Sequence, residues 1–496
     1  MLGETSILIV IIPLISAALT PLVGLAREGL SYLCTITALT LSTLASVHTL
    51  FRVLTEGTVH YGLGGWPPPF GIELVVDPLN GMMLVLVSAV GLIVAVYSYR
   101  GVEQELTGRM VYFYTLYLLQ VTGFLGILIT GDLFNLYVFL EIASLAGYAL
   151  IAVGEDGAPM ACFRYIVMGT VGACFYLLGV GYIYISTGSL NMADVHLLMK
   201  GLYDSKVIAT AIAFILTGLA IKMALFPLHV WLPDAYTKAP SAASALIAPL
   251  MTKISIYVMI RILFSVFGIS LFVELFPLNR IMVWAGFAAI CGGAVMALAQ
   301  TDFKRMLCYI LVAEVGYMIG GLGLANAIAI RGAILHILND AVMTAGLFTV
   351  AGIIMHRMKS HRLADFEGLF QKMPFTMSAF VVCALSMIGV PPTCGFFSKW
   401  YLIHGAILAR QWPFVAALLG SSLINGILFF RVIEVGYVFQ SSTPAHTHAG
   451  EGMNRMEEAP LSMLIPTVGI AVAIILIGFY NQAIVKHIID FALPKL

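Results

Sequence analysis

The chain has 496 residues, of which 60% are hydrophobic and 10% charged, and its mean hydropathy is +1.00. Many apolar windows of about 20 residues exclude a soluble globular domain and indicate an all-α polytopic membrane protein embedded in the lipid bilayer. The formal net charge of zero gives no reason to expect nucleic acid as a partner.

The seven cysteines all fall in or at the ends of apolar segments, and none forms a CxxC motif or a Cys/His cluster. We therefore expect no metal site, no cofactor and no disulfide framework, and interpret these residues as small packing side chains. Any redox chemistry would have to belong to partner subunits.

Hydropathy predicts about 14 transmembrane helices in one membrane domain. The first is expected to be a true span, because it lacks a basic leader and its apolar run is too long for a cleaved signal. The longest polar loops are 356–372 and 440–458. The predicted spans lie near 5–25, 30–51, 76–99, 109–129, 132–153, 160–187, 207–226, 242–265, 279–299, 304–324, 328–356, 374–393, 413–438 and 459–482.

Prolines interrupt two of these spans. The seventh breaks at FPLHVWLPD, where Pro227 follows Lys222 by five residues and a turn-like WLPDA comes next; the twelfth breaks at Pro391 and Pro392. Prolines kink membrane helices routinely, but a pair of interrupted segments in corresponding halves indicates an inverted-repeat transporter. The predicted parts are 1–99 (helices 1–3), 109–265 (repeat one, helices 4–8), 279–438 (repeat two, helices 9–13) and 459–496 (helix 14 and the C-terminus).

Glu141 lies inside the apolar run YVFLEIASLAGYALI and needs a partner or a proton at that depth. Lys222, of opposite charge and similar depth, is its expected partner. Pairing would keep Lys222 charged, and loosening the pair would favour loss of its proton, which makes the pair a proton switch. The alternative is a static ion pair that fixes helix register.

Later spans carry further ionisable residues. His336 and Asp340 are four residues apart, hence on one helix face, and are expected to form a polar patch that holds water. Lys253 lies deep in its span, whereas Arg261 would snorkel to the outer interface. Taken singly, a membrane histidine is usually a satisfied core residue. The whole series, which predicts a lateral proton relay near the midplane, is Glu141, Lys222, His229, Lys253, Glu314, His336, Asp340 and Lys399.

Four stretches resemble one known family. LAIKMALFPLHVWLPDAY, KAPSAASALIAPLMTKISIY, TDFKRMLCYILVAEVGYM and GVPPTCGFFSKW are similar to the antiporter-like membrane subunits of respiratory complex I, membrane-bound hydrogenases and Mrp-type Na+/H+ antiporters. The resemblance covers roughly spans 3 to 13, and the chain length is most similar to the MrpD-type members of the family. It implies a 14-helix fold with two inverted five-helix repeats and broken helices 7 and 12.

The resemblance also implies roles for individual residues. Glu141 matches the glutamate of helix 5, Lys222 the lysine of helix 7, and Lys253 the helix 8 lysine that links the two halves. His336 matches the helix 11 histidine, and Lys399 the helix 12 lysine that ends the axis.

Three positions depart from the family pattern. Thr344 stands where a lysine is often found, Asp340 where histidine is frequent, and Glu314 where a small polar residue or histidine is common. Because Thr344 carries no charge, we expect Glu314 or Asp340, with His336, to supply the protonatable step.

The main functional hypothesis is a subunit of a multisubunit Na+/H+ antiporter that moves H+, and possibly a path for Na+ shared with other membrane subunits. The alternative is a proton-pumping subunit of a redox-driven complex, and a third is a scaffold that transports nothing. A modest excess of Lys and Arg in the loops opposite the termini predicts both termini outside, in a prokaryotic cell (inner) membrane.

Overall fold

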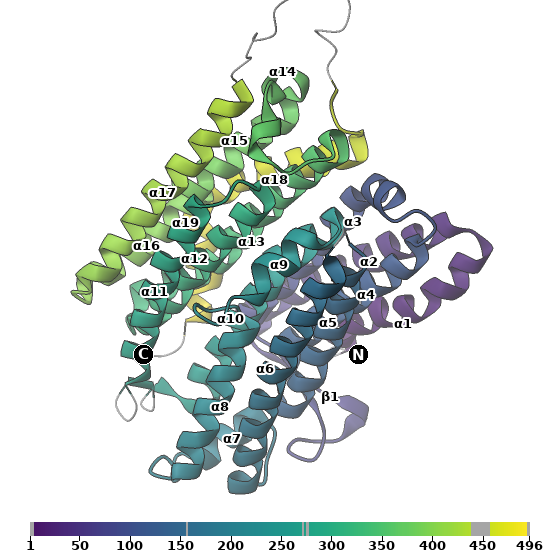
Figure 1. Ribbon diagram of the computed structural model, residues 1–496. Coiled ribbons are helices and arrows are strands. Elements are labelled where there is room, and N and C mark those ends of the chain that lie inside the picture. Colours follow the sequence, from purple (N-terminus) through teal and green to yellow (C-terminus); the bar gives the residue numbers. More distant parts are fainter. Residues whose placement is uncertain (1–3, 155–156, 270–271, 274–276, 438–456, 494–496) are drawn as a thin grey trace, which may run out of the picture.

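The computed structural model describes residues 4–154, 157–269, 272–273, 277–437 and 457–493, and nearly all of its elements are helices (Figure 1). The long helices are α1 (Glu4–Ala26), α2 (Glu28–Glu56), α3 (Pro78–Glu105), α4 (Met110–Ile129), α5 (Leu133–Ala152), α6 (Ala158–Thr187), α8 (Lys206–Lys222), α10 (Ser241–Ile260), α11 (Leu278–Leu298), α12 (Phe303–Gly323), α13 (Ala327–Met358), α15 (Pro374–Ile388), α16 (Cys394–Leu408), α17 (Trp412–Tyr437) and α18 (Leu461–Phe479). The short elements are β1 (Val59–Gly62), η1 (Leu63–Gly65), β2 (Glu73–Val76), α7 (Met192–Met199), α9 (Trp231–Lys238), the π-helical η2 (Arg261–Phe267), η4 (Leu363–Phe366), α14 (Leu369–Lys372), α19 (Asn481–Ile484), the π-helical η5 (Val485–Ile489) and α20 (Asp490–Ala492).

Within the described residues, twelve helices are long and apolar enough to cross a membrane, with η2 counted as the end of α10. Helices suit this setting because every backbone group must be bonded inside the chain where no water is present. The two predicted interrupted spans are pairs of shorter helices, α8 with α9 and α15 with α16. The helical membrane class is confirmed, and the total of 14 spans stays a prediction. The predicted loop 440–458 lies almost wholly outside the described residues.

The two predicted repeats share a distinctive connection. Asp132, before α5, forms a β-bridge with Asn191, and Asp302, before α12, forms one with Arg362. Each aspartate also caps the following helix by accepting a hydrogen bond from a backbone amide, at 2.7 and 2.8 Å. The short helix after the bridge is α7 in repeat one and α14 in repeat two, and these lie at opposite ends of the bundle (Figure 1). The same unit at opposite ends is the arrangement expected of inverted repeats.

The first helix break separates α8 from α9. α8 ends at Lys222, and Ala224 adopts a left-handed backbone with φ 57°. The indole nitrogen of Trp231 donates to the carbonyl of Ile221 at 3.1 Å, which satisfies one carbonyl that the break leaves free. The predicted turn at WLPDA is wrong: these residues begin α9, because a helix tolerates Pro233 in its first turn.

The second break separates α15 from α16. Gly389 has φ 96°, which glycine adopts without strain, and α16 begins at Cys394. The ammonium of Lys399 donates to the carbonyl of Met387 at 2.5 Å, and the Asn339 amide donates to the carbonyl of Cys394 at 2.7 Å. Side chains of the predicted path therefore satisfy the carbonyls at this break.

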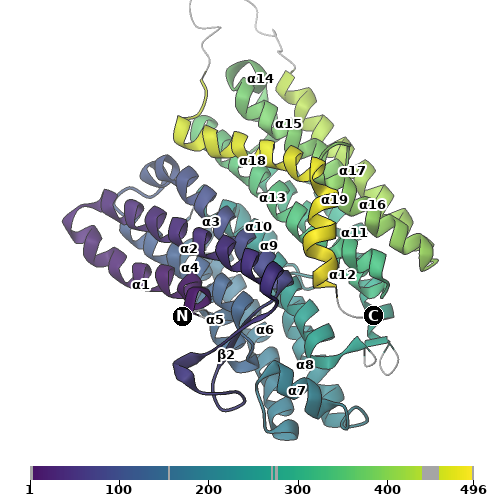
Figure 2. The same cartoon turned by 180° about the vertical axis from the view of Figure 1, so that it is seen from behind.

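Burial differs sharply between the inner and outer helices. In the most apolar window, 94% of residues are buried in α12 and in α13, against 33% in α1 and in α2. Figure 2 shows α18 running across α13 on the far side of the molecule from the view of Figure 1. Polar side chains on α10, α12 and α13 are thus surrounded by this chain's own helices and not by lipid.

Candidate functional site

The first cluster of ionisable residues joins α5 and α8. The Lys222 ammonium lies 3.3 Å from Oε1 of Glu141 and donates to the Ser144 hydroxyl at 2.7 Å. α6 and α8 approach closely one turn earlier, where a Cβ on Gly218 would lie 2.5 Å from the carbonyl oxygen of Gly172. Small residues allow such close packing in membranes. The predicted pairing of Glu141 with Lys222 is therefore present and is held by a tight helix contact.

This first cluster is open on one side. The Lys222 side chain is 2% exposed, whereas the Glu141 side chain is 24% exposed. A buried ammonium needs its counter-ion, because an unpaired charge in a low-dielectric site is strongly disfavoured. Glu141, by contrast, reaches the surface of the chain and can change its surroundings without leaving a charge in the core.

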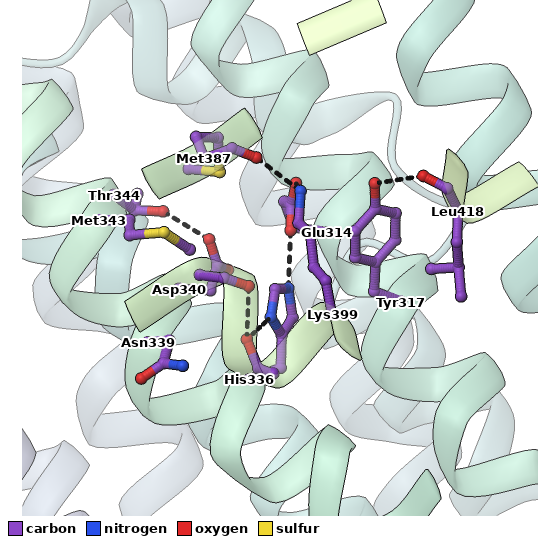
Figure 3. A network of polar contacts seen from close by, with 12 residues as sticks. Glu314, Tyr317, His336, Asn339, Asp340, Met343, Thr344, Met387, Lys399 and Leu418 are labelled. Atoms are coloured by element: carbon purple, nitrogen blue, oxygen red, sulfur yellow. Dashed lines mark hydrogen bonds and ion pairs between the residues drawn. The ribbon is translucent and has the colours of Figure 1, made fainter. Parts of the chain in front are cut away.

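The second cluster lies at the centre, between α10 and α13. The Lys253 ammonium is 2.7 Å from Oδ2 of Asp340, and both side chains are fully buried. The Thr344 hydroxyl donates to the other oxygen of Asp340 at 3.0 Å, as Figure 3 shows. The predicted patch of Asp340 with His336 is wrong: the two residues share a helix face, but their side chains bind different helices.

The third cluster joins α12, α13 and α16. Nε2 of His336 lies 2.7 Å from Oε2 of Glu314, and Nδ1 lies 2.9 Å from the Ser398 hydroxyl (Figure 3). Ser398 donates its own hydrogen to the carbonyl of Gly395 at 3.2 Å, so it accepts from Nδ1–H. The contact between His336 and Glu314 then holds one proton, either on the imidazole or on the carboxyl group.

Lys399 completes the third cluster on the other oxygen of Glu314. Its ammonium lies 3.5 Å from Oε1 of Glu314 and 4.8 Å from the centre of the Tyr317 ring. The Asn425 amide donates to the same carboxylate oxygen at 3.3 Å. Glu314, with no exposed side-chain surface, thus faces a histidine, a lysine and an amide at once.

His229 stands apart from the three clusters. It follows Pro227 in the first break, and its ring stacks on Phe226 with centroids 5.1 Å apart and faces the edge of Tyr309. Its Nδ1 is buried without a hydrogen-bond partner in the described part of the chain. The structure therefore gives His229 an aromatic setting and no direct contact with the other predicted site residues.

The three clusters are also separate from one another. In the part of the chain that the structure describes, no direct hydrogen bond or ion pair links Lys222 to Lys253, or Lys253 to His336. A proton that crosses these gaps needs bridging water or a side-chain movement.

Three polar residues that the sequence reasoning missed take part in the clusters: Ser144, Ser398 and Asn425. Ser144 lies one turn beyond Glu141, and Ser398 precedes Lys399, so both lie beside predicted site residues. Asn425 is an amide inside the apolar span SSLINGILFF, and polar groups in such spans face the bundle interior. That rule was the available signal for Asn425.

The described residues contain no group of three or more His, Cys, Asp or Glu side chains arranged to hold a metal ion, and all seven cysteines are free. The site is therefore described by its carboxylate, lysine and histidine groups.

Comparison with known proteins gives matches along the whole chain. A family model described as "NADH:quinone oxidoreductase/Mrp antiporter, TM" matches residues 130–425. NADH-quinone oxidoreductase subunit N of Desulforudis audaxviator is 46% identical over 502 residues, which cover 100% of this chain and 99% of that protein. A Na(+)/H(+) antiporter subunit of Alkalihalophilus pseudofirmus is 33% identical over 453 residues, covering 90% and 88% of the two chains.

A solved structure gives the same result. A chain of the membrane-bound sulfane sulfur reductase, an archaeal respiratory membrane complex, superposes with a TM-score of 0.89 at 29% identity, covering 98% of this chain and 96% of that one. The family model spans more than half of the 496 residues, from the start of α5 to the middle of α17. This chain therefore belongs to the NADH:quinone oxidoreductase/Mrp antiporter family of multi-pass membrane proteins.

Proposed function

We propose that this chain is the proton-translocating membrane subunit of a multisubunit complex and that protons pass along the three clusters. The observation that carries the proposal is that Glu141, Asp340 and Glu314, one in each cluster, all lie within 3.5 Å of a lysine ammonium. Ionisable residues inside membrane spans are costly and typically belong to ion pathways or proton relays. A row of ammonium groups suits protons, because it repels metal cations on the same route.

The first step is a switch at Lys222. While Glu141 stays close, the ammonium keeps its proton and its hydrogen bond to Ser144. When the carboxylate moves away, the enclosed ammonium is disfavoured and gives up its proton. The exposed side of Glu141 is where a neighbouring subunit or a lipid-facing movement would act on the pair.

The second step passes through the central pair. Lys253 receives a proton across a water-sized gap and is held by Asp340. Thr344 cannot carry charge, but its hydroxyl holds one oxygen of Asp340 and so fixes the orientation of that carboxylate. The role that family members give to a lysine at Thr344 falls here to Asp340 and to the proton shared by Glu314 and His336.

The last step ends at Lys399. The proton shared by His336 and Glu314 lies on one carboxylate oxygen, and Lys399 faces the other. A proton that shifts toward the carboxyl group weakens its hold on Lys399, which then releases its own proton. His229, which contacts none of the clusters, has at most an auxiliary role at the first break.

Two driving forces fit this chemistry. Na+/H+ exchange is the function that the sequence predicts, and the relative named as a Na(+)/H(+) antiporter subunit supports it. A redox-driven proton pump is the second candidate, supported by 46% identity over the full chain to a subunit N of NADH-quinone oxidoreductase. In both cases other membrane subunits are the partners, any Na+ path lies partly in another subunit, and both termini face outward from a prokaryotic cell membrane.

The test is ion flux by the intact complex in liposomes, measured with an internal pH dye. We expect Lys222→Ala to abolish proton flux while the complex still assembles. Lys206→Ala is the matched control, because Lys206 is an exposed residue at the start of the same helix. Normal flux in Lys222→Ala would overturn the proposal, and loss of assembly would favour a structural ion pair.

The same liposomes distinguish the two driving forces. Flux that depends on a Na+ gradient without a redox substrate indicates antiport, and flux that starts only with a redox substrate indicates a pump. A complex that moves protons under neither condition would make this chain a scaffold subunit.

A further inference from the structure

Arg261 points to a part of α10 that the path described above does not use. Instead of snorkelling to the interface as predicted, its guanidinium pairs with Asp77 at 2.5 Å and its Nε donates to the Tyr257 hydroxyl at 2.8 Å. Lys253, Tyr257 and Arg261 follow one another at four-residue spacing, so they lie along one face of the helix. This face leads from the central pair toward one end of the molecule.

A polar cavity of about 150 Å³ opens at that end, beside the hairpin β1–β2 that lies at the bottom of Figures 1 and 2. Tyr257 and Arg261 form part of its wall, and Asn80 and Ser265 also line it. Liquid water occupies about 30 Å³ per molecule, so the cavity has room for several waters.

The outer part of the cavity is built from titratable groups. His60 and Glu73 line it and contact each other at 2.8 Å across the hairpin, and the His60 side chain is 59% exposed. The Asn191 amide donates to the second oxygen of Glu73 at 3.0 Å. An exposed imidazole beside a carboxylate exchanges protons with bulk water near neutral pH.

The inner part is closed by Tyr257. This residue is 3% exposed, and its hydroxyl donates to the carbonyl of Leu128 at 2.9 Å while accepting from Arg261. One helical turn deeper, Lys253 has a single charged partner, Asp340, and the ammonium makes no other bond within the described residues. An ammonium has three donors, so Lys253 can hold a water between itself and Tyr257.

We infer that this cavity, with Tyr257, Arg261 and Asp77 at its inner wall, is the route by which Lys253 exchanges protons with water at the hairpin end of the molecule. The inference rests on the proposed function, because it assumes that Lys253 carries protons. It gives the central pair its own outlet, in addition to the transfer toward Lys399.

The transfer balances at each step. The Lys253 ammonium loses one proton to a bridging water, Tyr257 accepts one proton at its hydroxyl oxygen as it donates another, and cavity water gains one. Arg261 keeps its charge throughout, because a guanidinium does not deprotonate in proteins. Its positive charge, fixed by Asp77, repels cations from the inner wall and so makes passage depend on the hydroxyl of Tyr257.

The first experiment removes that hydroxyl in the intact complex. Tyr257→Phe is expected to lower proton flux about tenfold or more, the usual scale for loss of a proton-transfer group. Tyr117→Phe is the matched control, because Tyr117 is also buried and its hydroxyl bonds a helix carbonyl, that of Gly91, at 2.7 Å. Both variants are compared with Lys222→Ala in the same liposomes.

The outcomes separate the two proposals. If Tyr257→Phe transports like Tyr117→Phe while Lys222→Ala is inactive, the outlet is wrong and the proposed function stands. If Lys222→Ala transports normally, the proposed function fails and the outlet fails with it.

A second measurement leaves Tyr257 and its neighbours intact. Ser265 lines the cavity and is exposed, so Ser265→Cys can be modified with a membrane-impermeant maleimide after assembly. We expect modification to block most of the flux of this variant, with no effect on the parent complex treated alike. Full modification, verified by mass spectrometry, with unchanged flux would overturn the outlet.

Discussion

Repeat one and repeat two each bring a lysine against a glutamate, but the surroundings of the two carboxylates differ. Glu141 meets one cation, Lys222, and 24% of its side chain is exposed. Glu314 has no exposed side-chain surface and meets His336 and Lys399 together. An open pair can separate at low cost, whereas a closed network has no place for an unpaired charge. Repeat one therefore suits switching, and repeat two suits holding a proton.

The lysines also stand differently with respect to the helix breaks. Lys222 is the last residue before its break, and Trp231 satisfies the neighbouring free carbonyl. Lys399 follows its break and itself donates to the freed carbonyl of Met387. Loss of the Lys399 proton would weaken that bond, so only in repeat two is the protonation of the lysine tied directly to the shape of the broken helix.

The largest effect is expected from Glu314→Gln, which tests whether repeat two is the closed site. Removing the carboxylate leaves His336 and Lys399 without an anion, at a cost of about 3–5 kcal/mol. We expect a lower melting temperature of the complex in detergent and loss of proton flux. Unchanged melting and flux would show that Glu314 holds no charge there.

Glu141→Gln tests the open site. Its carboxylate reaches the surface, so we expect melting close to that of the Lys206→Ala control, but a loss of proton flux of about 100-fold. The measurements are the same two as for Glu314→Gln. A fall in stability as large as that of Glu314→Gln would contradict the difference between the repeats.

The β-bridges of the two repeats give a pH test. In repeat one the carbonyl of Leu190 accepts from the amide after Asp132, and in repeat two His361 takes the same place beside Phe303. Burial, and then the charges of Lys304 and Lys238, lower the pKa of His361 from 6.5 to about 3. The unfolded chain thus binds a proton below pH 6.5 that the folded chain refuses until about pH 3, so stability falls as the pH falls.

We therefore expect His361→Leu, which copies repeat one, to remove this acid-sensitive contribution. At pH 5 the contribution is about 2 kcal/mol, from about 1.4 kcal/mol per pH unit. Melting of the parent and the variant between pH 7.5 and 5 measures it. Parallel melting curves of the two proteins over this range would contradict a buried neutral His361.

The smallest effect is expected at Thr344. Thr344→Val keeps the shape but removes the hydroxyl that donates to Asp340, a loss of about 1 kcal/mol and a few-fold lower flux. Thr349→Val is the control, because the Thr349 hydroxyl bonds the carbonyl of Gly346 in its own helix. Equal behaviour of the two variants would leave Thr344 with no role in orienting Asp340.

Much of the framework followed from residue types and their order. Apolar runs predicted the helical spans, and Pro227, Pro391 and Pro392 predicted the two breaks. Charge and depth were enough to predict the pairing of Glu141 with Lys222, because a lone ammonium inside a membrane needs an anion. The roles of these residues in transport remain predictions.

Spacing along one helix failed where the partner lies on another. His336 and Asp340 share a face of α13, yet one binds Glu314 on α12 and the other binds Lys253 on α10. The i, i+4 rule describes neighbours on an isolated helix, and here opposite charges on packed helices offered stronger contacts. Asn425 was missed for the same reason, since its partner lies 111 residues away in sequence.

The sequence by itself determined that this chain crosses a membrane many times, that two of its helices are broken, and which of its buried side chains can carry charge. Only the tertiary structure decided how those charges are grouped: one open pair, one enclosed pair and one closed network. It also placed Arg261 against Asp77 and not at the membrane surface. The physical reason is that a buried charge is stabilised by whichever opposite charge packing brings within about 4 Å, and packing is a property of the whole fold.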